Sequence, residues 1–71
     1  MASSKRIDKK ILEERVRQLL AVDTMAMNVY TDLAKNVEDQ DLKDIFSKIA
    51  GEENTHIALS REILSLLNGQ R

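Results

Sequence analysis

Residues spaced alternately four and three apart recur in two long series, and few folds other than packed helices tolerate such a repeat. A strict seven-residue repeat keeps one face of a helix toward a partner helix and favours a left-handed supercoil. The chain is therefore predicted to be all-α, with two helices that pack along these series. The first series is Leu12, Val16, Leu19, Asp23, Ala26, Tyr30, Leu33 and Val37, and the second is Leu42, Phe46, Ile49, Glu53, His56, Ser60, Ile63 and Leu67.

The helix boundaries follow from the residues that break or stop a helix. Proline is absent and glycine occurs only twice in 71 residues, so nothing interrupts a first helix over about 6–37. A turn is predicted at 38–40 and a second helix at about 40–68. One domain, residues 1–71, is expected, because so short a chain has no room for a second. The predicted architecture is a long antiparallel helical hairpin.

Capping residues support these limits. Ser3 or Ser4 could cap a helix that begins near Arg6, and Asp39 is a favourable N-cap for the second helix. Gly69 is predicted to end that helix, since glycine adopts the left-handed conformation that closes many helices.

The apolar stripes are broader than one partner helix can cover. A chain of this size also rarely buries enough apolar surface to be stable alone. We therefore expect a homodimer in which two hairpins form a four-helix bundle. The residues that widen the stripes are Leu20, Met27 and Ala34 on the first helix, and Ile45, Ala50, Ile57, Leu59, Leu64 and Leu66 on the second.

Composition excludes several classes of function. Eleven basic against twelve acidic side chains leave a net charge of -1, so neither nucleic acid nor an anionic membrane surface is expected as a partner. Cysteine is absent, which excludes disulfides, thiolate zinc sites, iron–sulfur centres and thiol nucleophiles. No apolar run is long enough for a membrane span, and no signal peptide is recognisable. A cytoplasmic protein is expected.

Three ionisable residues, Asp23, Glu53 and His56, fall on the otherwise apolar series. Glu53 and His56 form an E-x-x-H spacing, which places both side chains on one helix face about 5–6 Å apart. Asp23 lies 16 positions before residue 39 and Glu53 lies 14 after it, so an antiparallel hairpin brings them to similar heights. The three side chains are predicted to converge.

The charges of these residues indicate a metal site. A dimer would bring two copies of Asp23 and Glu53 together, four carboxylates with a formal charge of -4, beside two imidazoles. Buried carboxylates cost several kcal/mol unless they are compensated, and two divalent ions would cancel the charge. This donor set suits iron, manganese or zinc, and open positions favour redox iron.

The stretch from Leu19 to Leu67 resembles the ferritin-like superfamily, and rubrerythrin-type sequences in particular. The matching features are Asp23 followed seven positions later by Tyr30, the turn at 37–39, Phe46 with Ile49, and the segment 52–56, Glu-Glu-Asn-Thr-His. One chain carries half of the family's ligand set, as in the two-helix encapsulated ferritins. The resemblance implies a di-iron site at a dimer interface that oxidises Fe(II) with dioxygen or peroxide. It also leaves open a higher homo-oligomer and an iron-storage compartment as partner.

By resemblance, Glu53 would bridge or chelate metal, His56 would bind through one ring nitrogen, and Asp23 would replace the family's first-helix glutamate. Aspartate is one methylene shorter, so the activity of the site is left open. Tyr30 would donate a hydrogen bond to a ligand carboxylate, and Glu52 would lie at the rim. No catalytic residue separate from the metal ligands is implied.

Two alternatives remain at this point. The chain could be a non-enzymatic helical dimerisation or adaptor module, in which a buried cluster of His56 with Asp23 or Glu53 fixes the register. The metal could also be structural, for example zinc or calcium joining oligomers. Gly51, which costs a helix roughly 1 kcal/mol relative to alanine, is explained by neither, although close approach of another subunit would account for it.

Overall fold

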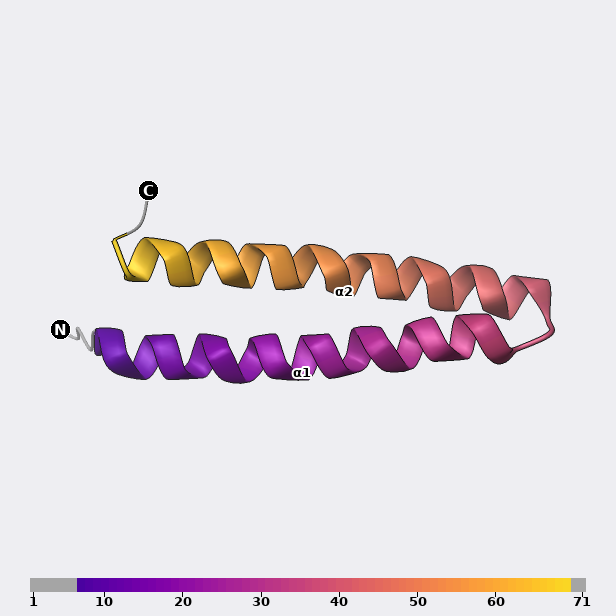
Figure 1. Cartoon of the computed structure of the whole chain (residues 1–71), viewed down its shortest axis with the longest axis horizontal. Coiled ribbons are helices and arrows are strands. Elements are labelled where there is room, and N and C mark those ends of the chain that lie inside the picture. The colour runs from indigo at the N-terminus through magenta and orange to yellow at the C-terminus, as the bar shows by residue number, and fades with distance from the viewer. Residues whose placement is uncertain (1–6, 70–71) are drawn as a thin grey trace, which may run out of the picture.

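The computed structural model describes residues 7–69, which form two long helices joined by a short turn (Figure 1). Helix α1 spans Lys9–Asn36 and helix α2 spans Gln40–Leu67, each with 28 residues. The helices run antiparallel and side by side, so the start of α1 lies at the same end of the molecule as the end of α2 (Figure 1). No strand occurs within residues 7–69. The predicted all-α hairpin is confirmed, while its pairing into a four-helix bundle stays a prediction.

The first helix begins later than predicted. Asp8 is its N-cap, because the Asp8 carboxylate accepts a hydrogen bond of 2.7 Å from the backbone N–H of Lys10. The N–H of Leu12 donates to the Asp8 carbonyl, which closes the first helical turn. The predicted start near Arg6 is therefore wrong, and Ser3 and Ser4 lie outside the described residues.

The turn and the second helix agree closely with prediction. Asp39 caps α2 by accepting a hydrogen bond of 2.9 Å from the N–H of Leu42. Val37 leaves α1 in an extended conformation, and the Lys43 ammonium donates 2.9 Å to the carbonyl of Ala34. This bond satisfies one of the C-terminal carbonyls that a helix leaves without an internal partner. Gly69 has a φ of +73°, as expected of the residue that ends α2.

The contact between the helices uses only part of the predicted series on α1. Val16 is buried and Tyr30 is half-buried, as expected, but Leu19 is 59% exposed. Leu20 and Met27, which lie next to the predicted series, point toward α2 instead and are half-buried. Two consecutive residues point in directions 100° apart around a helix. A single partner helix therefore covers one of the two side chains, and the other stays exposed.

The same shift occurs on α2. Ile57 and Leu64 are the buried residues, with exposures of 5% and 8%. The predicted neighbours His56 and Ile63 are exposed. Within residues 7–69 the hairpin thus pairs along one side of each predicted stripe, and the other side of each stripe is left uncovered.

The unpaired sides lie on the same face of the hairpin. In antiparallel right-handed helices, the residues that directly precede the inward positions project to one common side of the pair. We call this surface the apolar face. Its exposed apolar members are Ile11, Leu19, Val22, Val29, Leu33, Leu42, Ile45, Leu59, Ile63 and Leu66.

The enclosed core is correspondingly small. Only Val16, Ile57 and Leu64 are buried apolar residues, and Ser60 is the buried polar one among residues 7–69. The molecule measures 53 × 29 × 14 Å, so along its shortest axis it has room for a single layer of helices. A bilayer-spanning segment needs about 20 largely apolar residues, and neither helix within residues 7–69 contains one.

Candidate metal centre

The three predicted ligands lie together near the middle of the hairpin. Asp23 comes from α1, and Glu53 and His56 come from consecutive turns of α2. One ligand atom from each residue can be chosen so that these atoms all lie within 4.8 Å of one another. The predicted convergence of these side chains is confirmed. Two carboxylates and an imidazole form a donor set suited to a divalent first-row metal ion.

Glu53 has a buried carboxylate oxygen that lacks a hydrogen-bond partner. Its Oε1 atom is inaccessible to solvent and has no hydrogen-bond partner. Nδ1 of His56 lies 3.7 Å from this oxygen, which is too long for a hydrogen bond. Leaving a buried acceptor unpaired costs about 1–3 kcal/mol. The oxygen is therefore in a position where a cation would satisfy it.

His56 occupies a different environment from its two neighbours. Asp23 and Glu53 are half-buried between the helices, whereas the side chain of His56 is 61% exposed. Its predicted place on the inward seam differs from the structure because Ile57 takes that place. His56 instead directly precedes an inward position, so it lies on the apolar face. Its ring is accessible to whatever covers that face.

The sequence also predicts Tyr30 and Glu52 at this site. The ring of Tyr30 packs on Phe46, with centroids 6.2 Å apart and a tilt of 32°. Tyr30 follows Asp23 by two helical turns on the same seam, and the hydrogen bond from its hydroxyl to a ligand carboxylate stays a prediction. Glu52 is exposed and precedes Glu53. It is not among the three converging residues, and its place at the rim also stays a prediction.

Sequence reasoning identified the three residues but missed the difference in their burial. A weak signal was present in the sequence, because Ile57 directly follows His56 and competes with it for the inward position. Nothing in the sequence indicates that Glu53 Oε1 is buried without a hydrogen-bond partner. This property depends on the conformations of the side chains packed around it.

Comparison with known families, with curated proteins and with solved structures finds no match to this chain.

Proposed function

We propose that the chain is a ferritin-like metal-binding protein whose Asp23, Glu53 and His56 hold a dimetal, di-iron site at the interface of a homodimer. The observation that carries this proposal is the buried, unpartnered Oε1 of Glu53 within a group of two carboxylates and an imidazole. A divalent cation would bind that oxygen and offset the negative charges of the Asp23 and Glu53 carboxylates. The Leu19–Leu67 resemblance supplies the choice of iron.

The apolar face supports the dimer. Ten exposed apolar residues lie on it, and the exposed residues Glu52 and His56 lie near its centre. A second copy placed on this face would bring its own three ligands to the same region.

The chain's own residues then have defined tasks. Glu53 holds a carboxylate in a site that excludes water from one of its oxygens. Asp23 provides the opposing carboxylate from α1, and His56 provides a nitrogen from the interface side. Bound as a pair, two iron ions would supply two electrons to dioxygen or peroxide. The protein contributes geometry and charge, and no further acid or base is needed among the described residues.

The test is an anaerobic titration of the metal-free protein with Fe(II), followed by admission of air with near-ultraviolet absorbance recorded throughout. We expect about two iron ions per dimer and a fast absorbance rise on oxidation. Glu53→Ala should weaken iron binding at least tenfold, because it removes a ligand. Glu62→Ala is the matched control, since it removes the same charge from an exposed position of α2 nine residues from Glu53, and it should leave binding unchanged.

Several outcomes would count against the proposal. If Glu53→Ala and His56→Ala bind iron as well as the wild-type chain does, these residues are not ligands. One ion per dimer without oxidation would indicate that aspartate at position 23 does not support the dinuclear chemistry. Tight zinc binding, together with no site-dependent oxidation of added Fe(II), would favour a structural metal.

The apolar face also supports a second candidate, a dimerisation or adaptor module that needs no metal. In this case the 3.7 Å approach of His56 to Glu53 serves to fix the register of the bundle. The double variant Glu53→Gln with His56→Leu discriminates the two functions. It should leave the module's dimer as stable as before or more stable, whereas it should abolish iron binding by a metal protein.

A further inference from the structure

A groove opens on the face of the hairpin opposite the apolar face, close to the turn. It has a volume of about 510 Å³ and is lined by Thr31, Ala34, Lys35, Lys43, Ser47 and Ala50. Volumes of about 300–1,000 Å³ are typical of small-molecule sites. The groove exists because Ala34 and Ala50 occupy inward positions where other layers of the hairpin carry Leu, Ile, Met or Phe, so its floor is left unfilled.

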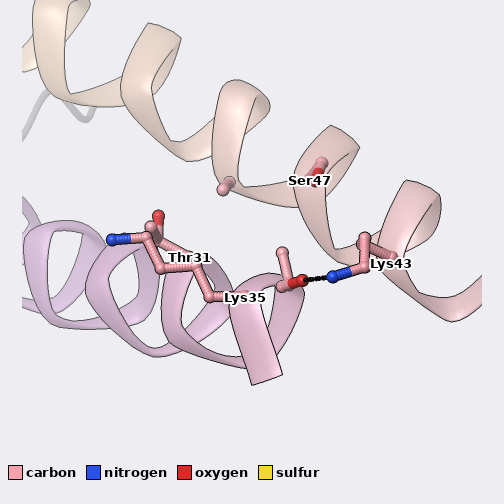
Figure 2. A pocket seen from close by; sticks show the side chains of 6 residues that line it. Thr31, Lys35, Lys43 and Ser47 are labelled. Atoms are coloured by element: carbon pink, nitrogen blue, oxygen red, sulfur yellow. Dashed lines mark hydrogen bonds between the residues drawn. The ribbon is translucent and has the colours of Figure 1, made fainter. Parts of the chain in front are cut away.

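The walls of the groove carry hydrogen-bond donors and positive charge. Thr31 and Lys35 line it from α1, and Lys43 and Ser47 line it from α2. In Figure 2 the Lys35 side chain extends along α1 past Thr31, whereas the Lys43 side chain turns toward α1 at the other end of the groove. Neither lysine forms an ion pair among the residues that the structure describes. Two lysines and two hydroxyl-bearing residues thus line one concavity, with the two ammonium groups at its opposite ends, in a chain whose net charge is -1.

Lys43 is held in place at the edge of this groove. Its Nζ donates 2.9 Å to the carbonyl of Ala34 (Figure 2), and its side chain is part-buried. An ammonium group has three donor hydrogens, so two remain for a ligand. A lysine that is already positioned loses less side-chain entropy when it binds an anion.

The nearby carboxylates do not neutralise the lysines. Asp39 accepts from the backbone N–H of Leu42, and Asp44 accepts from the side-chain amide of Gln40. Together with Glu38 and Asp41, they make the turn beyond the groove acidic. A long polyanion such as a nucleic acid would be repelled there, whereas a small anion inside the groove would meet the two cations.

We infer that this groove binds a small phosphate-bearing anion, with Lys35 and Lys43 as its charge partners and Thr31 and Ser47 as hydroxyl donors. A phosphate group offers more charge and more acceptor oxygens than a carboxylate, and so it matches two ammonium groups and two hydroxyls better. The inference does not depend on the metal site, which lies near the middle of the hairpin.

The test is a titration of the metal-free, ¹⁵N-labelled full chain with sodium pyrophosphate at constant ionic strength, followed by amide chemical shifts. We expect the shifts to centre on Thr31, Lys35, Lys43 and Ser47. Lys35→Gln should weaken binding about threefold to fivefold, the upper part of the range for an exposed charge pair. Lys48→Gln is the matched control on α2 outside the groove, and it should not change the affinity.

Lys35→Gln is the primary variant because Lys35 makes no hydrogen bond among the described residues, so its loss should not disturb the turn. Lys43→Gln should weaken binding as well, provided that its thermal unfolding curve matches that of the wild-type chain. Shifts spread over all the lysines, or an equal loss in Lys35→Gln and Lys48→Gln, would show adventitious binding and overturn the inference. Equal shifts with succinate would overturn the assignment to phosphate.

Discussion

Two aspartates determine where the helices of this protein begin. Asp8 and Asp39 each direct a side-chain oxygen at a backbone N–H of the first turn that follows. Such N–H groups have no partner inside the helix, and an aspartate also interacts favourably with the helix dipole. The cap on α2 is the more consequential of the two, because it lies at the turn and sets where the second helix starts relative to the first.

We expect Asp39→Ala to lower the free energy of unfolding by about 1 kcal/mol, the usual loss for an N-cap. Asp41→Ala is the control, since Asp41 lies in the first turn of α2 and is not its N-cap. Its effect should stay below about 0.5 kcal/mol. Urea denaturation at a fixed protein concentration measures both values, and equal losses in the two variants would contradict the capping role.

Among single residues, Glu53 connects stability to the candidate function. Its Oε1 atom is buried without a hydrogen-bond partner among the described residues, and an unpaired buried acceptor costs about 1–3 kcal/mol. A bound divalent ion should therefore raise the melting temperature of the wild-type chain, because a ligand that binds only the folded state stabilises it. Differential scanning calorimetry with and without Fe(II) under argon measures this shift, and the shift should disappear in Glu53→Ala.

At the level of the helices, Gly51 is the residue that local structure does not explain. It lies inside α2, has an ordinary helical conformation, and a Cβ atom built there meets nothing within 4 Å. Residues 7–69 therefore give no reason for a glycine at this position.

We expect Gly51→Ala to raise the free energy of unfolding by up to about 1 kcal/mol, because alanine has less backbone freedom to lose and a higher helix propensity. Chemical denaturation at low protein concentration is the measurement. A loss of stability at high concentration, with a gain at low concentration, would show that another subunit approaches this part of α2. A loss at both concentrations would contradict the prediction.

At the scale of the whole molecule, the apolar face is the feature that most affects stability and association. The hairpin buries few residues completely, while ten apolar side chains remain exposed on one side. Its folding and its association are therefore expected to be coupled, so that apparent stability rises with protein concentration.

Leu59→Lys places a charge on the apolar face, where Leu59 is 52% exposed. We expect this variant to sediment as a monomer of 8.1 kDa, whereas the wild-type chain should sediment at twice that mass. Ala58→Lys is the matched control, because Ala58 is exposed and points to the other side of α2. Analytical ultracentrifugation distinguishes these results, and dimers of equal strength in both variants would show that the apolar face is not the interface.

Much of this architecture could be predicted from local rules. The seven-residue repeat and the absence of proline indicated two helices, Asp39 and Gly69 marked the limits of the second, and the position of the turn placed Asp23 beside Glu53. Each of these features depends on neighbours within a few residues or on counting positions along a helix. Such information is contained in the order of the residues.

Other features depended on the tertiary structure. The start of α1 at Lys9 could not be separated from earlier capping positions, since Ser3, Ser4 and Asp8 are all suitable N-caps. The choice of Ile57 over His56 as the inward residue, and the exposure of Leu19, required a partner helix, because adjacent apolar positions are equivalent until one of them is covered. The isolation of Glu53 Oε1 likewise arises only when side chains from both helices close around it, since burial is a property of the packed pair and not of either helix alone.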